Sequence, residues 1–332
     1  MIKSLSSLRF VFAIIVFLLH IGKINVAIGH AFFIVLSGFI LSMVYEKRIL
    51  DQNFSFGSFF KKRLLRTYPL HILTLLLAIP LAFSFTKIFV AKIFLNLFSV
   101  QVFIPIKEFY FSLNGVSWNL ADLLIFYACF PFLIRILSKF SFRTFTIILG
   151  LIVLMILFLM NLISEECHHY LFYISPYFRI FDFIFGIYLY QITKKISFTP
   201  NYFTASLIEI GTLSLCVVLF FIANHHYEYI KPQIYSVYIW IPLFLVMIGF
   251  YFDKGIISKH ILGTTFMLSL GKLSFSFYMI HHLVIRYFQT YGTSLEITEN
   301  SGFVLCFLIS LALAYLSNKY FESLFYSSKN NE

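Results

Sequence analysis

Long apolar runs recur along the whole chain, and they constrain its fold more than any other feature of the sequence. A helix needs about 20 consecutive apolar residues to cross the hydrocarbon core of a bilayer. Runs of this kind lie approximately at 8–25, 29–45, 66–88, 117–136, 144–163, 176–192, 204–223, 234–252, 264–287 and 302–324. They are continuous rather than alternating, which excludes a membrane β-barrel. The sequence therefore predicts an all-α transmembrane bundle of about ten spans.

Composition and charge placement agree with this class. Of the 332 residues, 60% are hydrophobic and 12% are charged, whereas about 25% are charged in soluble domains. The net charge of +11 could indicate nucleic acid, but the basic residues lie in short connections, so the positive-inside rule explains them better. With the N-terminus inside, inner segments hold more than twice as many Lys and Arg residues as outer ones. We predict no nucleic-acid partner and cytoplasmic termini.

One transmembrane domain is expected over 1–327, with a short cytoplasmic tail at 328–332. The first run has no convincing cleavage site and is expected to remain as the first span. Two connections are long: a basic cytoplasmic one at 46–65, and an outer one at 89–116 with a turn at Asn114-Gly115. Long loops tend to be functional. The four cysteines lack metal-type spacing, and no metal site is predicted.

The first run carries a polar pair, Arg9 and His20, with only apolar residues between them. On a helix the two share one face to within roughly 20° and stand about 16 Å apart along the axis. Ionisable groups in a span are functional-site candidates by default. The alternative is that Arg9 snorkels to the headgroups while His20 sits at the far interface.

Two further stretches have both a structural and a functional reading. Ser37-Gly38 lies in the second run, where small residues let helices approach closely, and packing is the favoured reading. Arg63 and Arg66 are spaced i, i+3 beside Lys61 and Lys62. Such a face suits phosphate groups, although an anchor on anionic lipid has the same pattern.

Polar residues also mark the fourth, sixth and ninth runs. Trp118 and Asp122 stand at a span entrance, where the carboxylate either orients a substrate or lies among headgroups. Arg179 and Asp182 form an expected i, i+3 ion pair with a structural role. Ser274, Tyr278 and His281 follow i, i+4, i+7 spacing, so this polar stripe should face the bundle interior.

These stretches together resemble acyltransferase family 3, the polytopic membrane acyltransferases of bacterial surface-glycan modification. The matching stretches are, in chain order, Arg9 with His20, Gly29–Phe39, Phe60–Pro69 with its two arginines, Trp118–Pro131, Leu270–His281 and Tyr320–Glu322. Two positions depart from the family pattern. Leu123 stands where Glu is frequent, with Asp122 one step earlier, and Phe275 replaces the usual Tyr.

The resemblance implies transfer of an acyl group, acetyl in particular, from acyl-CoA to a carbohydrate hydroxyl at the bacterial inner membrane. Arg63, Arg66 and Lys62 are then expected to hold the CoA phosphates on the cytoplasmic side, with Arg9 at the same level. A neutral imidazole at His20 can take the proton from the attacking hydroxyl.

Other site residues and one rival function complete the set of expectations. His281 is the second candidate base, and Arg9 is a further candidate catalytic residue. Candidate substrate contacts are Ser37, Trp118, Asp122 and Tyr278. The outer segment 89–116 is expected to take part in acceptor selection. A transporter or flippase of a glycan or lipid-linked precursor is the alternative function, although the chain lacks paired Gly/Pro-interrupted spans in two related halves.

Overall fold

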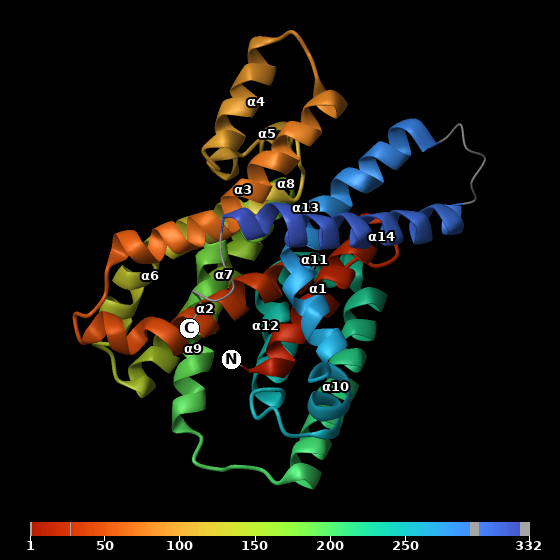
Figure 1. Ribbon diagram of the computed structural model, residues 1–332. Coiled ribbons are helices and arrows are strands. Elements are labelled where there is room, and N and C mark those ends of the chain that lie inside the picture. Colours follow the sequence, from red (N-terminus) through yellow and green to blue (C-terminus); the bar gives the residue numbers. More distant parts are fainter. Residues whose placement is uncertain (1, 27, 293–298, 326–332) are drawn as a thin grey trace.

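The computed structural model describes residues 2–26, 28–292 and 299–325, so the expected tail at 328–332 lies outside them (Figure 1). The regular structure in these ranges is helical, with no strand. The long helices are α1 (Lys3–His20), α2 (Ile28–Leu50), α3 (Phe56–Ala82), α6 (Ser117–Leu137), α7 (Phe142–Leu162), α9 (Pro176–Lys195), α10 (Tyr202–His225), α12 (Val237–Gly249), α13 (Thr265–Tyr291) and α14 (Glu299–Leu316). The predicted all-α class is confirmed.

Each predicted span overlaps one of these helices, although some bounds differ by five to ten residues, as for 66–88 and α3. Not all of the helices have the composition of a lipid-facing span. Within the described ranges, eight segments are long and apolar enough to cross a membrane. Helices α9 and α13 are not among them, because charged residues such as Arg179 and Lys272 interrupt their apolar sequence. The count of about ten spans and the cytoplasmic termini therefore remain predictions.

The expected long connection at 46–65 is wrong. Helix α2 continues to Leu50 and α3 already begins at Phe56, so only residues 51–55 join them. Ser55 caps α3 by accepting a hydrogen bond from the Ser58 backbone N–H at 3.4 Å. The basic segment is therefore the first part of a long helix, which fixes the faces of Arg63 and Arg66.

The outer segment 89–116 is folded rather than an open loop. It contains most of α4 (Lys87–Leu97), the 3₁₀ turn η1 (Gln101–Phe103) and α5 (Lys107–Tyr110). Figure 1 shows α4 at the top of the view, beside the C-terminal end of α3. The turn expected at Asn114-Gly115 is present, closed by a 2.9 Å hydrogen bond from the Ser117 N–H to the Asn114 carbonyl.

Close backbone approach at glycines brings the central helices together. Helices α2 and α9 pack along each other, as do α1 and α13. A methyl group added at Gly38 would overlap the Phe183 carbonyl, and one at Gly186 would overlap the Val35 carbonyl. Gly271 in the same way receives the backbone of Ser6. The packing reading of Ser37-Gly38 is thus confirmed, and these contacts fix α1, α2, α9 and α13 around the site.

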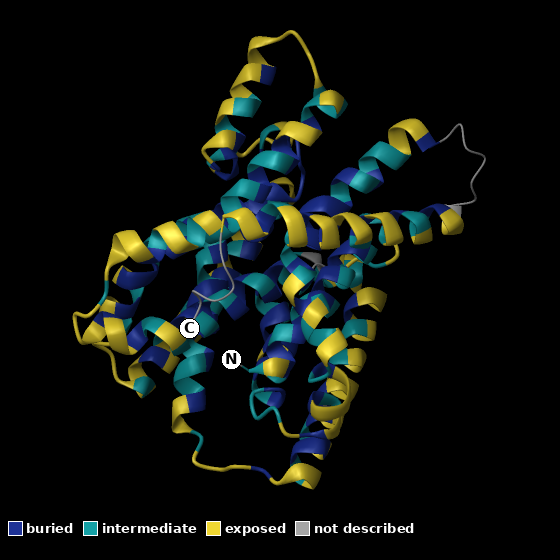
Figure 2. Cartoon of the chain, in the orientation of Figure 1, coloured by how far each residue is buried: buried dark blue, intermediate teal, exposed yellow. Residues whose placement is uncertain are grey.

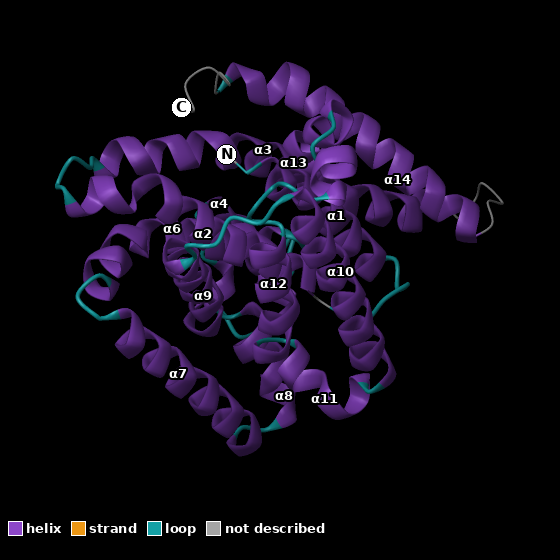
Figure 3. Ribbon diagram, turned by 90° about the horizontal axis from the view of Figure 1, so that it is seen from below, coloured by secondary structure: helices purple, strands orange, loops and turns teal. Residues whose placement is uncertain are grey.

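The helices at the periphery of the bundle point apolar side chains away from this core. On α7, Leu151, Leu154 and Phe158 are 60%, 63% and 65% exposed, and their spacing places them on one face. Figure 2 shows exposed residues along α10 and α14, and Figure 3 shows α7 at the margin of the bundle. Such faces suit contact with lipid.

Candidate active site

Helix α1 carries one polar residue to each of two cavities. Arg9 lines a cavity of about 150 Å³. We name this cavity and the one at His20 inner and outer after the orientation predicted from the sequence. His20, at the other end of α1, lines an outer cavity of about 650 Å³. Eleven helical steps separate the two residues, about 16 Å along the axis. The predicted pair therefore connects these two cavities.

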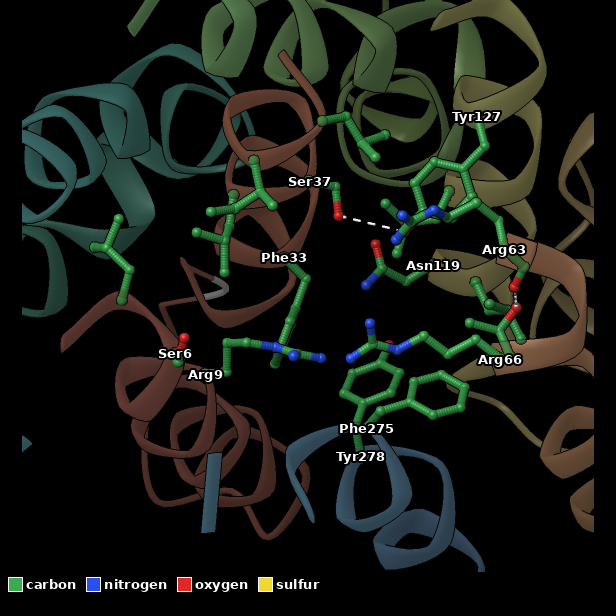
Figure 4. Close-up of a pocket in the computed structure, with 17 residues that line it drawn as sticks. Ser6, Arg9, Phe33, Ser37, Arg63, Arg66, Asn119, Tyr127, Phe275 and Tyr278 are labelled. Carbon is green, nitrogen blue, oxygen red and sulfur yellow. Dashed lines mark hydrogen bonds between the residues drawn. The ribbon is translucent and has the colours of Figure 1, made fainter. Parts of the chain in front are cut away.

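The inner cavity is a positively charged space. Arg9 enters it from α1, and Arg63 and Arg66 enter it from α3. In Figure 4 the side chains of Arg9 and Arg66 point towards each other across the cavity, and Ser37 and Asn119 lie near them. The described residues that line this cavity include no carboxylate. An anionic ligand in this cavity would therefore meet three guanidinium groups.

Aromatic side chains orient one of these arginines. The Arg63 guanidinium donates to the Tyr45 hydroxyl at 3.2 Å. It also lies over the rings of Tyr45 and Phe59, at 5.6 and 5.7 Å from their centroids. Stacking of this kind leaves the in-plane N–H donors free for a ligand. Of the predicted site residues, the catalytic candidate Arg9 and the donor contacts Arg63 and Arg66 line the same cavity.

His20 belongs to a hydrogen-bonded chain that fixes its tautomer. His281 Nδ1 lies 3.1 Å from the Phe277 carbonyl oxygen, which can only accept, so this nitrogen carries a proton. In the neutral ring, His281 Nε2 then accepts from Nδ1–H of His20, 2.9 Å away. The Nε2 atom of neutral His20 is consequently the one left as a proton acceptor.

The outer cavity combines His20 with residues from α13 and the α3–α4 region. His282 lines it with its ring centroid 5.1 Å from that of His20. Arg286 and Lys92 also line it, together with Phe89 and other residues. Since α4 supplies both Lys92 and Phe89, the folded outer segment forms one wall of the space next to His20.

A further contact ties the outer segment to the helical core. Tyr110 of α5 lies with its hydroxyl 3.2 Å from Nδ1 of His169, in the π-helical turn η2 (His169–Ile174). Burial raises the pKa of Tyr110 above its ordinary value, so the hydroxyl stays protonated and can donate to that nitrogen. This contact attaches the outer segment, which forms one wall of the outer cavity, to the turn η2.

A layer of aromatic and histidine rings separates the cavities, which share no lining residue. His30 is fully buried, 5.7 Å from His20 and 5.8 Å from Tyr278 between ring centroids. Its Nδ1 lies 2.9 Å from the Tyr173 hydroxyl, and its Nε2 has no hydrogen-bond partner among the described residues. Phe33 packs against Tyr278, with ring centroids 5.6 Å apart, and both side chains line the inner cavity.

Sequence reasoning missed His30, Asn119 and His282. A usable signal existed for His282, because Tyr278, His282 and Arg286 follow i, i+4, i+8 spacing on one helix face. Asn119 directly follows Trp118 in the chain and lines the inner cavity. No periodicity marks His30, since it is a single polar residue at the start of an apolar run.

Three predicted contacts lie outside both cavities. Lys62 is exposed on α3 and lines neither space. Trp118 is buried against His30, with ring centroids 5.2 Å apart. Asp122 is fully buried, and neither carboxyl oxygen has a hydrogen-bond partner within the described part of the chain. Their roles in binding remain predictions.

The other predicted residues are placed as follows. Ser37 lines the inner cavity, with its hydroxyl 3.4 Å from that of Tyr127. Ser274, Tyr278 and His281 are all buried, which confirms that the polar stripe of α13 faces inwards. The Ser274 hydroxyl donates to Gly271 of its own helix at 2.8 Å, so it is occupied structurally.

The expected ion pair on α9 is confirmed. Arg179 and Asp182 are each 1% exposed and lie 2.8 Å apart. Arg179 also donates to the Tyr235 carbonyl at 2.9 Å, and Asp182 accepts from the Trp240 indole at 2.5 Å. The Trp240 bond joins α9 to α12, and the Tyr235 bond joins α9 to the residue that follows α11 (Tyr227–Ile234). Such contacts agree with the structural role predicted for the pair.

The fold and the site thus describe a multi-pass membrane protein with a histidine pair between a cationic inner cavity and an outer one. Comparison with known proteins specifies the family. A family model described as "Acyltransferase domain" matches residues 2–319. The chain belongs to this family, acyltransferase family 3, in agreement with the resemblance seen in its motifs.

One curated relative and one negative result complete the comparison. The chain is 28% identical over 165 residues to "Acyltransferase MdmB" of Streptomyces mycarofaciens. That match spans 43% of this chain and 41% of the relative. No solved structure matches the chain significantly.

Proposed function

We propose that this protein transfers an acyl group, acetyl in particular, from cytoplasmic acyl-CoA to a hydroxyl of a carbohydrate at the bacterial inner membrane. One observation carries the proposal. His20, whose Nε2 is the proton acceptor of its hydrogen-bonded chain, borders the outer cavity, while three arginines line the inner one. The family membership supports the acyltransferase class and gives no support to the transporter alternative.

The donor is assigned from the charge of the inner cavity. Acyl-CoA is a polyanion of phosphates attached to a long, largely uncharged thioester arm. Arg9, Arg63 and Arg66 provide bidentate donors for phosphate oxygens. On the predicted orientation this cavity opens towards the cytoplasm, where CoA is found. The thioester arm would then extend towards the ring layer that contains Tyr278.

The chemistry is direct transfer with His20 as general base. His20 Nε2 takes the proton of the acceptor hydroxyl while the hydroxyl oxygen attacks the thioester carbonyl carbon. The new ester C–O bond forms, the C–S bond breaks, and the thiolate of CoA leaves. The proton on His20 then passes to this thiolate. The products are the ester and CoA with a free thiol.

Positioning of His20 depends on His281. The His281 side chain holds His20 by its Nδ1 and leaves Nε2 as the proton acceptor. This arrangement is analogous to the third group that orients the base in a hydrolytic triad. His281 is therefore assigned as a positioning residue rather than as the base.

The reaction also requires the rings that separate the two cavities to move apart. Phe33 and Tyr278 line the inner cavity, and Tyr278 lies 6.0 Å from His281 between ring centroids. An acyl group coming from the inner cavity must pass this aromatic pair to reach His20. We therefore expect acyl-CoA binding to be accompanied by a rotation of these rings.

The experiment compares membranes containing the wild type, H20A and H226A. His226 is exposed between α10 and α11 and serves as the matched control. Each preparation receives [acetyl-¹⁴C]acetyl-CoA and the surface glycan of the host, and base-labile label in the glycan is measured. We expect label with the wild type and H226A, and a loss of about 10²- to 10⁴-fold with H20A.

Two outcomes would contradict the proposal in different ways. Equal labelling by H20A and the wild type would remove His20 as the base. Absence of label with every protein, despite equal amounts in the membrane, would argue against acetyl transfer to this glycan.

A further inference from the structure

The outer cavity has a charge pattern that the proposed function does not yet use. Arg286 and Lys92 line it beside His20 and His282, and no carboxylate is found among its described lining residues. A cavity that is lined by positive charges alone raises the local concentration of anions. The acceptor side of the site is therefore electrostatically selective.

The two cations keep capacity for a ligand. Arg286 uses Nη1 to donate to the Leu113 carbonyl at 2.6 Å, which leaves most of its five N–H donors. Lys92 lies 3.8 Å from Glu108. That carboxylate is on a side chain that is 78% exposed, so the pair is loose and screened by solvent.

The distance between His20 and Arg286 determines where on a ligand an anionic group could bind. His282 and Arg286 are one helical turn apart on α13, a rise of about 6 Å. His282 itself packs against His20. A ligand whose hydroxyl meets His20 would thus place a group roughly one sugar ring away near the Arg286 guanidinium.

Apolar surface completes the cavity. Phe89 and Phe111 line it together with Leu113. Binding spaces that combine aromatic walls with a few polar groups hold ligands by ring contact and orient them by the polar groups. A sugar ring presents such an apolar face together with its hydroxyls.

We propose that the acceptor is an acidic carbohydrate, carrying a carboxylate on the accepting sugar or on its neighbour, and that Arg286 and Lys92 bind this group. The inference rests on the proposed function, since it identifies the outer cavity as the acceptor site. It adds the substrate class and two specificity-determining residues. An acidic sugar and an anionic lipid headgroup both carry a negative group that Arg286 and Lys92 could bind. We assign the ligand as the acidic sugar.

The test measures binding without any acyl donor. Protein in phosphatidylcholine nanodiscs is titrated with glucuronate and with glucose, a pair that differs in the carboxylate. The expected result is at least about tenfold tighter binding of glucuronate by the wild type, the size of one charge-assisted hydrogen bond. R286Q and K92Q should each lose most of this preference while glucose binding stays unchanged.

Two further variants keep the test independent of folding. R286K retains the charge and should keep part of the preference. K87Q removes an exposed charge on the same helix α4, outside the cavity lining, and should behave as the wild type.

Several outcomes would overturn the inference. Equal binding of the two sugars by the wild type, including no binding of either, would remove the acidic-sugar assignment. Loss of the preference when phosphatidylglycerol is added would assign the cations to lipid headgroups. Because no acyl-CoA is present, these results are separable from a failure of His20-dependent transfer.

Discussion

The hydrogen bond between His20 and His281 joins residues 261 positions apart and is the most specific contact in the site. Each ring alone could take either tautomer. The Phe277 carbonyl removes this choice for His281, and His281 then removes it for His20. The Phe277 carbonyl oxygen therefore determines, through His281, that Nε2 is the proton-accepting nitrogen of His20.

This chain predicts distinct effects for two substitutions of His281. H281A removes the acceptor for His20 Nδ1–H, so kcat should fall roughly 10- to 100-fold while KM for acyl-CoA is unchanged. H281Q offers an amide oxygen to the same N–H and should recover part of the rate. The measurement is initial-rate kinetics with labelled acetyl-CoA. A rise in KM with unchanged kcat, or no rescue by glutamine, would contradict the positioning role.

The inner arginines predict a change in donor affinity rather than in chemistry. R63A and R66A should each raise KM for acetyl-CoA about tenfold or more, because each removes charge-assisted bonds to phosphate. K62A is the matched control, since Lys62 is exposed on the same helix and lies outside the cavity. Steady-state kinetics at varied acetyl-CoA is the measurement. An equal effect of K62A would indicate that a general basic surface, not the cavity, attracts the donor.

At the scale of elements, glycine contacts decide how closely the central helices approach. Gly38 and Gly186 face each other's helices across the α2–α9 contact. The resulting distance sets where Ser37, on α2, meets Tyr127 of α6. Small residues at helix crossings allow this approach in membrane proteins, where packing takes over from the hydrophobic effect.

A methyl group at this crossing should be costly. We expect G38A and G186A each to lower the free energy of unfolding by about 1–3 kcal/mol, because the added Cβ overlaps a backbone carbonyl that has no rotamer to adopt. The apparent melting temperature in detergent is the measurement. G150A is the control, since nothing lies within 4 Å of a Cβ at that position on α7. An equal fall in G150A would refute the assignment.

At the scale of the whole molecule, the proposed reaction depends on which face each cavity opens to. The inner cavity must face the cytoplasm to receive acyl-CoA, and the outer segment must lie on the opposite side. Charge bias alone supports this orientation. Cys167, exposed on α8 (Glu165–His168), provides a native probe of the outer face.

The orientation predicts selective labelling of cysteines. A membrane-impermeant maleimide applied to cells with a permeabilised outer membrane should label Cys167 but not K62C placed in a C167S background. Both should react after the inner membrane is broken. Gel-shift of the labelled protein is the measurement. Labelling of K62C in intact inner membranes would reverse the orientation and with it the assignment of donor and acceptor cavities.

Much of this organisation was predictable from local sequence. Continuous apolar runs give the positions of the long helices, since a span is a local property of about 20 residues. Helical spacing likewise placed Ser274, Tyr278 and His281 on one buried face. The same reasoning misjudged 46–65, because polar and basic residues interrupt the apolar pattern there although the helix continues.

The remaining features required the tertiary structure. The sequence by itself determined a helical membrane bundle, the candidate residues Arg9, His20, Arg63 and Arg66, and the family to which they belong. Only the folded chain decided that His281 bonds His20 and that His30 fills the space between the cavities. The physical reason is that periodicity fixes which face of one helix a residue occupies, whereas partners across helices depend on close contacts such as those at Gly38 and Gly271.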